Sequence, residues 1–452
     1  MPLPRVSPLL STYRGLRYPT SPLGSFDVFR ARYGDTYEVY SGPQRGWVIV
    51  TERADLIDHV LRARHRNYGK SVIVTEVLAS YIGHGLLTLD GEGWRAQRRL
   101  IQPGFHRDRL ATLTRVIDEE ARAWADALPA DGRPVDLYAT TLPLALQIMA
   151  RVLFSGRVSP AELHTIAHAV ELGQEDFARE LRQPLLRPWR RLTNSRAAAD
   201  AATRRAVEVL LAQIADHRRA AAEGRPYDDL LQMLLDARYE DGSAMTDAQL
   251  VDETLVLILA GHETTAIGLA CTLHLLAEHP AWAERLRAEW HDTFGEGDPD
   301  ATGLRGLAAH SAVIHEGLRL YPPAYLVSRR ARADDDSFAG LDVREGQTVI
   351  CSVWGAHHNP ANFRDPERFD PARYLERETT TNFAFGGGPR QCVGIHLALM
   401  EMQVALGRVL LARKLAPVPE RPLRFSGSAT LRPVGGVWVR VGRRFKVTQF
   451  NY

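Results

Sequence analysis

The run Phe385-Gly386-Gly387-Gly388-Pro389-Arg390-Gln391-Cys392-Val393-Gly394 places one cysteine between a glycine-rich loop and a predicted helix. From Ile395 onward apolar residues recur at helical spacing, so Cys392 lies at or just before the first turn of that helix. Free N–H groups and the helix dipole at this end favour an anionic sulfur. The run therefore predicts a thiolate that ligates a soft metal ion. The alternative is a buried cysteine that serves as a small apolar residue after a glycine turn.

This run resembles the haem-binding loop of the cytochrome P450 family, Phe-x-x-Gly-x-Arg-x-Cys-x-Gly, and matches every fixed position. The resemblance implies a mainly α fold with smaller β-sheets (α+β). In this fold a long central helix lies over a haem, and the cysteine loop lies on the opposite face. The resemblance also implies haem b as the cofactor and Cys392 as the axial iron ligand. Further cofactor contacts are then expected from Phe385, Gly388, Arg390 and Gly394.

A long helix is predicted between Thr246 and Pro280. Thr246 and Gln249 form a plausible capping box, and Pro280 suits a helix stop. Near the middle, Gly261 and two adjacent threonines are poor helix formers, and threonine hydroxyls can bond back to the preceding turn. We therefore expect the helix to distort there.

The same segment, Ala260-Gly261-His262-Glu263-Thr264-Thr265, resembles the oxygen-activating helix of the P450 family. The resemblance implies that Ala260 and Gly261 let the cofactor and dioxygen approach. It also implies that Glu263 and Thr264 are the catalytic residues that relay protons through water to bound dioxygen. The alternative is a surface acid beside a threonine kink.

Glu316 and Arg319 are three residues apart, one helical turn, and such a pair is usually exposed and weak. Downstream, Pro366-Glu367-Arg368-Phe369 resembles a P450 segment whose arginine joins that pair. The resemblance thus implies a desolvated triad of Glu316, Arg319 and Arg368 behind the cysteine loop, with a structural role.

A haem carries two propionates, which need cationic or hydrogen-bonding partners. Trp94 and Arg98 are four residues apart and resemble the Trp-x-x-x-Arg of the family. Arg390 and Arg329 match further propionate contacts, and the choice between Arg329 and Arg330 stays open by one place.

Composition bounds the function. The chain has 452 residues and a net charge of +2, and no basic run alternates with aromatic residues, so nucleic acid is not an expected partner. Three cysteines without framework spacing favour a reducing, cytoplasmic compartment. Residues 1–27 lack a long apolar stretch, so we expect no membrane anchor, a soluble protein of the bacterial type, and a monomer.

The motifs extend from Trp94 to Gly394, so we expect one P450 domain over residues 1–452. A β-containing portion is expected within about residues 1–70, followed by a helical body with late β-hairpins over residues 71–452. Strands are predicted within residues 36–50, at 348–350 and at 436–441.

By resemblance, apolar residues line the substrate pocket, which predicts a lipophilic small molecule, with a terpenoid or other natural product preferred and fatty acids next. The predicted pocket residues are Val256, Ala260, Thr264, Ala324, Tyr325, Val327 and Ala429.

The resemblance implies a monooxygenase that splits dioxygen and takes electrons singly from a ferredoxin with its ferredoxin reductase. Arg98, Arg99 and Arg390 are expected to place positive charge where an acidic ferredoxin docks. Two alternatives remain open: a haem-thiolate peroxygenase or isomerase, and a non-catalytic haem-binding sensor.

Overall fold

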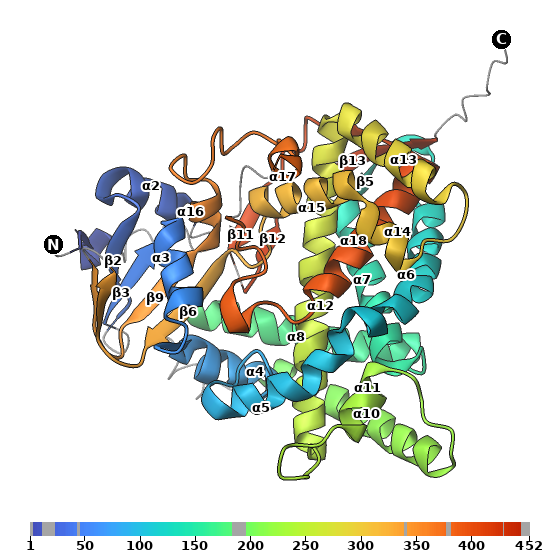
Figure 1. The fold of residues 1–452 in the computed structure, drawn as a ribbon, viewed down its shortest axis with the longest axis horizontal. Helices are drawn as coiled ribbons and strands as arrows, with labels where there is room; N and C mark the ends of the chain where they lie inside the picture. Colours follow the sequence, from blue (N-terminus) through green and yellow to red (C-terminus); the bar gives the residue numbers. More distant parts are fainter. Residues whose placement is uncertain are drawn as a thin grey trace.

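The computed structural model describes residues 3–10, 23–42, 46–182, 196–338, 341–376, 381–427 and 429–443. Part of the amino-terminal stretch expected to lack an anchor, residues 11–22, lies outside these ranges. Figure 1 shows a sheet-rich side that contains the N-terminus and a helical side that contains most of the long helices.

The largest sheet has six strands in the order β1-β2-β3-β9-β6-β4. The bounds are β1 Arg5–Val6, β2 Thr36–Tyr40, β3 Trp47–Thr51, β4 Tyr68–Lys70, β6 Leu326–Ala331 and β9 Thr348–Ser352. β2 and β3 pair as an antiparallel hairpin, and β3 pairs in parallel with β9. These strands confirm the predictions within residues 36–50 and at 348–350.

Three smaller sheets have the orders β10-β13-β5, β11-β12 and β7-β8. Their bounds are β5 Asp131–Asp136, β7 Asp335–Phe338, β8 Leu341–Val343, β10 Arg413–Pro417, β11 Phe425–Gly427, β12 Leu431–Pro433 and β13 Trp438–Arg443. The strand predicted at residues 436–441 is β13, which begins two residues later.

Helices make up most of the remaining structure. The α-helices are α2 Leu23–Tyr33, α3 Ala54–Asp58, α4 Ala79–Ile82, α5 Gly91–Ile101, α6 Arg107–Ala127, α7 Leu137–Phe154, α8 Pro160–Arg182, α10 Ala197–Ala222, α11 Leu230–Asp236, α12 Asp247–Glu278, α13 Pro280–Phe294, α14 Ala301–Gly306, α15 Ala308–Leu320, α16 Val353–His357, α17 Ala372–Leu375 and α18 Ile395–Ala412. Short helical segments are η1 His59–Ala63, η2 Ile73–Leu78, η3 Gln102–Phe105 and η5 Gly388–Arg390.

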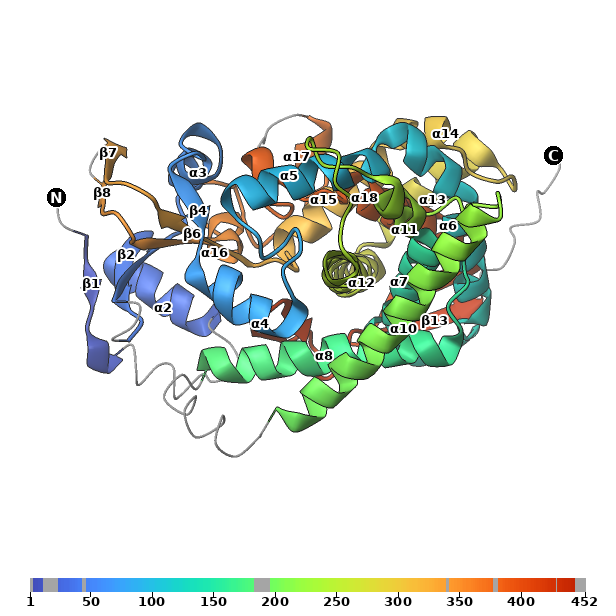
Figure 2. The same cartoon turned by 90° about the horizontal axis from the view of Figure 1, so that it is seen from below.

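The longest helix, α12, runs through the centre of the helical side and is seen end-on in Figure 2. The predicted capping box is present: the Gln249 N–H donates to the Thr246 hydroxyl, and the Gln249 side chain accepts from the Thr246 N–H. The helix is α-helical at every residue, so the expected distortion near Gly261 is wrong. A back-bond from the Thr264 hydroxyl to the Ala260 carbonyl, 2.6 Å long, is compatible with a continuous helix.

By length and composition, α7, α12 and α18 are apolar enough to cross a membrane, yet most of each apolar window is buried inside the protein, 83% in α12. All three belong to the largest hydrophobic cluster, so their apolar character is accounted for by the core. A second cluster lies under the main sheet and includes Phe383, which leads into the cysteine loop.

Candidate active site

Cys392 lies just before α18, as its spacing predicts. Its backbone N–H donates to the Phe385 carbonyl at 3.0 Å, which closes the loop, and Gly394 caps the helix. Gly388 has a φ of +66°, and a Cβ there would lie 2.1 Å from the Leu61 carbonyl oxygen. This position therefore requires glycine, because the loop packs directly on the backbone of η1.

Cys392 is the exposed cysteine, whereas Cys271 and Cys351 are buried. Partial burial of the Cys392 thiol raises its pKa, and the Gly394 N–H and the Arg98 charge oppose that shift. Burial raises the pKa of Cys351 to about 12. Of the three sulfurs, that of Cys392, just before the N-terminus of α18, is thus accessible to a ligand and has neighbouring groups that favour its anionic form.

One face of α12 is accessible although the helix lies in the core. From Glu253 to Ala277 every residue is buried except Ala260, Gly261 and Thr264. These three are also predicted site residues, and α12 contacts α18, the helix that follows the cysteine loop. A side chain at Gly261 would point toward α7, because a Cβ there would lie 2.7 Å from the Met149 sulfur. Its small size therefore also serves the packing of α7 against α12.

The Glu263 carboxylate points away from that face. Its Oε1 accepts from Arg432 Nε at 2.8 Å and from the Tyr138 hydroxyl at 3.2 Å. Its Oε2 accepts from Gln174 Nε2 and Thr430 Oγ1, each at 2.9 Å. These donors come from α7, α8, β12 and the turn before β12.

Burial alone would raise the pKa of Glu263, but the charge and hydrogen bonds of Arg432, with those of Thr430 and Gln174, bring it below its ordinary value. The carboxyl is therefore ionised and fully hydrogen-bonded. Adjacent residues leave a helix about 100° apart, so Glu263 and Thr264 lie on different faces. The predicted relay did not anticipate this separation.

Arg390 is largely enclosed beside Trp94. Its guanidinium lies 4.9 Å from the centre of the Trp94 ring and pairs with Asp90 at 2.7 Å. Its Nε is buried without a hydrogen-bond partner. Arg98 Nη1 donates to the Gln391 carbonyl at 3.0 Å, which ties α5 to the cysteine loop.

The two adjacent arginines of β6 differ in burial, which favours Arg329 as the propionate partner without testing that contact. Arg329 is buried, and burial lowers its pKa to about 10, whereas Arg330 is exposed and donates to the Gly346 carbonyl. Sequence reasoning missed Lys70 in β4. Burial, together with the charges of Arg329 and Arg390, lowers its pKa to about 7. A single lysine in a short strand gave no sequence signal that it would lie buried near Arg329 and Arg390.

The predicted triad is wrong in one member. Glu316 binds Arg319 through two hydrogen bonds of 2.7 and 2.9 Å, and both side chains are fully buried. The third cation is Arg373 of α17, whose Nε lies 3.2 Å from Glu316. Arg368 is exposed and contributes only its carbonyl to Arg319, because the turn at Pro371 brings the later arginine inward.

His357 connects this cluster to the cysteine loop, which sequence reasoning did not foresee. The Arg319 guanidinium donates to the His357 carbonyl at 2.8 Å. The imidazole bonds the Arg319 carbonyl through Nδ1 at 3.1 Å and accepts the Phe383 N–H through Nε2 at 2.9 Å. Burial holds its pKa well below its ordinary value, so the neutral ring acts as donor and acceptor.

The structure divides the predicted substrate-pocket residues. Ala324 and Val327 are partly accessible, and Ala429 is exposed, like Ala260 on α12. Val256 and Tyr325 are buried and present almost no accessible surface. Tyr325 packs in a cluster with residues of α2 and β2, so its burial follows from the neighbouring sheet.

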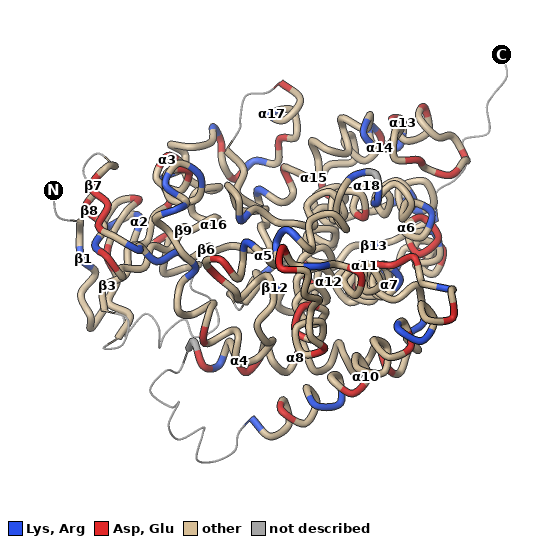
Figure 3. The backbone as a smooth tube through the Cα atoms, turned by 60° about the horizontal axis from the view of Figure 1, so that its bottom comes forward, with Lys and Arg blue, Asp and Glu red and all other residues tan. Residues whose placement is uncertain are grey.

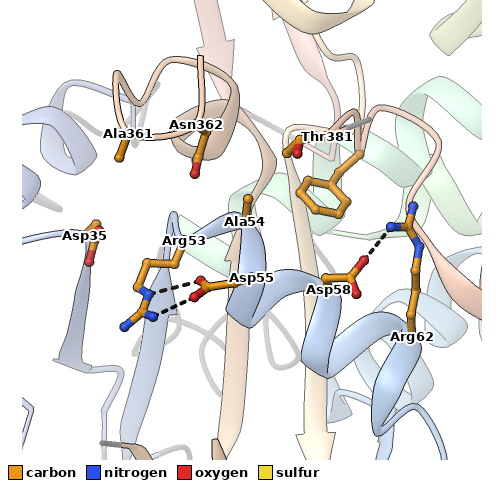
Figure 4. A pocket seen from close by; sticks show the side chains of 10 residues that line it. Asp35, Arg53, Ala54, Asp55, Asp58, Arg62, Ala361, Asn362 and Thr381 are labelled. Carbon is orange, nitrogen blue, oxygen red and sulfur yellow. Dashed lines mark hydrogen bonds and ion pairs between the residues drawn. The ribbon is translucent and has the colours of Figure 1, made fainter. Parts of the chain in front are cut away.

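A separate surface pocket of about 700 Å³ lies beside the start of the cysteine loop (Figure 4). Arg53 pairs there with Asp55, and Arg62 pairs with Asp58. Phe383 also lines the pocket, but no residue of α12 does. It is therefore distinct from the accessible face that holds Thr264.

The cytochrome P450 family model matches residues 1–435 of this chain. The chain belongs to the cytochrome P450 family. This P450 is 32% identical to cyclooctat-9-en-7-ol 5-monooxygenase of Streptomyces melanosporofaciens, over 86% of this chain and 84% of that protein. It is 29% identical to leukotriene-B4 omega-hydroxylase 3 of Mus musculus, over 95% and 85%. The haem domain of cytochrome P450DA superposes with a TM-score of 0.85 at 22% identity, covering 98% of each chain. The protein is thus an oxidoreductase of the P450 monooxygenase family.

Cys392 and a group of buried cations in this P450 fit a haem-thiolate cofactor. Lys70 and Arg329 are cations in buried surroundings, and neither has an ion pair with a carboxylate among the described residues. With the unpartnered Nε of Arg390, they form a cationic group that two propionates would neutralise. Cys392 would ligate the iron, while Arg98, Arg329, Arg390, Lys70 and the Trp94 indole would hold the propionate side.

Proposed function

We propose that this P450 binds haem b, activates dioxygen with two externally supplied electrons, and hydroxylates or epoxidises a lipophilic small molecule. The accessible face of α12 carries this proposal most directly. Its three accessible residues, Ala260, Gly261 and Thr264, belong to the segment whose pattern matches dioxygen activation in the family. The bound haem, with a thiolate ligand, supplies the redox chemistry that cleaves dioxygen.

The chain's own residues would orient reactants and deliver protons. The Thr264 hydroxyl donates a hydrogen bond to the Ala260 carbonyl, so its partly accessible oxygen can still accept one from water. Glu263 is ionised and fully bonded, so it must give up a hydrogen bond before it can accept and pass on a proton. We therefore assign Thr264 to the accessible face, where the reaction would take place. Glu263 would supply protons from a different face of the helix, where Arg432 holds it.

A terpenoid is the preferred substrate class. The accessible pocket residues Ala260, Ala324 and Val327 are apolar, which suits a lipophilic molecule. Two relatives at 32% and 31% identity are named cyclooctat-9-en-7-ol 5-monooxygenase and cyclooctatin synthase, which favours a terpenoid. The name leukotriene-B4 omega-hydroxylase keeps fatty-acid-like molecules as the second class.

We infer that an acidic ferredoxin, reduced by its reductase, is the electron donor. Two of the arginines first expected at the docking face are less available, because Arg390 is enclosed and Arg99 pairs with Glu240. Other basic residues surround the cysteine loop. Arg62, Arg64 and Arg66 lie at and after the backbone on which Gly388 packs, and all three are exposed. Arg62 pairs with Asp58 and Arg64 with Asp335, as Arg99 does with Glu240.

On the other side of the loop, the charges of Arg107 and His106 act on His396 at the start of α18. Both Arg107 and His106 are exposed. Figure 3 shows basic residues near α3 and along α5. This basic surface, Arg62 to Arg66 with Arg98, His106 and Arg107, suits an acidic partner.

The experiment combines a spectrum with turnover. The reduced carbon monoxide complex of the wild type should show the absorption of a thiolate-ligated haem. Cys392→Ser should lose it, while Cys271→Ser, a buried control, should keep it. Product from a terpenoid panel should require ferredoxin, reductase and dioxygen. Product with peroxide alone would favour a peroxygenase. An unchanged spectrum in Cys392→Ser would overturn the assignment of the ligand.

A further inference from the structure

Two neighbouring acids of α12 hold the segment between α4 and α5. Asp252 Oδ2 accepts from the His84 N–H at 2.7 Å. Glu253 Oε2 accepts from the Leu86 N–H at 2.9 Å, and Lys70 Nζ donates to the Leu86 carbonyl at 2.6 Å. The Glu253 carboxyl and the Lys70 amino group thus hold opposite ends of one residue's backbone. Both backbone groups of Leu86 are satisfied by these side chains, so this contact ties the segment to α12 and β4.

Two glycines allow the segment to lie against α12. Gly83 has a φ of +80°, and a Cβ there would lie 2.2 Å from Asp252 Oδ1. A Cβ at Gly85 would lie 2.9 Å from Val256 Cγ2. The segment is also closed on itself by the Thr88 hydroxyl, which donates to the Gly83 carbonyl at 2.8 Å. A side chain at either glycine would push the segment away from the helix.

Glu253 occupies an unfavourable position for a carboxyl group. It is 0% exposed, and its Oε1 has no hydrogen-bond partner. A second donor to Oε2 is Gln97 Nε2 at 2.8 Å, and the side-chain oxygen Oε1 of Gln97 accepts from the Tyr239 hydroxyl at 2.8 Å. Burial raises the pKa of Glu253 to about 7. An apolar side chain at this position would avoid the free-energy cost of burying a carboxyl group. The hydrogen bonds from Glu253 to Leu86 and Gln97 therefore account for the presence of an acid here.

The held segment adjoins the accessible face of α12. Glu253 precedes Ala260 by seven residues and Thr264 by eleven, which brings all three within about 20° of one direction around the helix. Leu86 is turned into the core at 8% exposure, whereas Leu87 keeps 38%. The segment therefore lies against the Glu253 side of α12, and Leu87 is its exposed apolar side chain.

We propose that Glu253 is a positioning residue for substrate binding, which holds the Gly83–Leu89 segment against α12 so that Leu87 forms part of the substrate-site wall. Lys70 and Gln97 complete this contact. The inference rests on the proposed function, because it takes the accessible face of α12 as one side of the substrate site. The position of Leu87 in the substrate-site wall then depends on one buried acceptor, Oε2 of Glu253.

Hydrogen exchange of the haem-loaded enzyme tests the contact itself. Glu253→Leu removes the acceptor, so amides in residues 83–89 should exchange about tenfold faster or more. Glu253→Gln keeps an acceptor oxygen and should stay near the wild type. Glu278→Leu, an exposed acid on the same helix, is the matched control and should leave the segment unchanged. Equal exchange in wild type and Glu253→Leu would overturn the proposal.

Two haem ligands test the wall. Imidazole reports iron ligation alone, whereas 4-phenylimidazole also needs an apolar wall. Glu253→Leu should weaken 4-phenylimidazole relative to imidazole by about fivefold, and Glu253→Gln should not. Leu87→Ala should reproduce the loss without faster exchange, which keeps the test valid if Glu253→Leu folds poorly.

The outcomes separate two failures. If exchange rises in Glu253→Leu while the ratio of the two affinities stays constant there and in Leu87→Ala, the segment is not a substrate wall and this inference is wrong. The same holds if the wild type binds both ligands equally. If the wild type lacks the thiolate spectrum with carbon monoxide, the proposed function fails instead.

Discussion

The guanidinium of Arg432 and the carboxylate of Glu263 form an ion pair with Nη2 and Oε1 2.6 Å apart. The pair joins β12 to the middle of α12, and the glutamate side chain is 2% exposed. This contact keeps the acid of the Glu-Thr pair ionised and turned from the accessible face. In the proposed mechanism, proton supply from Glu263 to Thr264 would therefore depend on the packing of β12, α7 and α8 around the acid.

Arg432→Gln should destabilise the protein by about 3 kcal/mol at neutral pH, because a buried charge loses its partner. In the wild type the depressed pKa of Glu263 stabilises the fold above the ordinary value of 4.5, and this is lost as pH falls through the folded-state pKa. In the variant, burial should raise that pKa, so the deficit should shrink as the solution is acidified. Denaturant unfolding at several pH values measures this. Arg440→Gln, an exposed pair with Glu420, should cost under about 1 kcal/mol, and an equal loss in both variants would contradict the prediction.

Arg373→Met should lower the free energy of unfolding by about 3 kcal/mol, since it removes one of the two cations that neutralise the buried Glu316. Arg368→Met should change it by no more than about 0.5 kcal/mol, because that side chain is exposed. Chemical denaturation of both variants decides between them. The reverse order of stabilities would restore Arg368 as the triad member.

Thr264→Ala should leave haem binding intact and divert electrons from product to peroxide, because the hydroxyl on the accessible face is lost. Product formed per NAD(P)H consumed measures this coupling. Thr272→Ala is the matched control on α12: its hydroxyl makes the same kind of back-bond, to Gly268 at 2.7 Å, but is buried. Unchanged coupling in Thr264→Ala, or an equal fall in both, would remove Thr264 from proton delivery.

Charge reversal on the basic surface should slow reduction by an acidic ferredoxin. Arg107→Glu and Arg66→Glu should each lower the rate without changing the absorption spectrum, and added salt should lower the wild-type rate as the Debye length falls to about 8 Å. Stopped-flow reduction measures the rate. Arg205→Glu on α10 is the control because it is exposed on a different helix. A rate indifferent to salt and to both reversals places the donor elsewhere.

Local signals in the sequence determined the cysteine loop, the bounds of α12 and the main strands. The capping box at Thr246, the proline after α12 and the glycines before Cys392 act through residues a few positions away. Because these interactions lie within one contiguous segment, the sequence carries them directly. The motif around Cys392 was sufficient to predict the family and the fold.

Only the tertiary structure decided which side chains meet. Arg373 rather than Arg368 reaches Glu316, Arg329 rather than Arg330 is buried, and Lys70 joins the cationic group without any motif. Side chains at adjacent positions on a strand or in a turn point in different directions. Which of them points inward is set by the packing of segments far apart in the chain. The separation of Glu263 from Thr264 has the same origin, since the partners that hold the acid come from α7, α8 and β12.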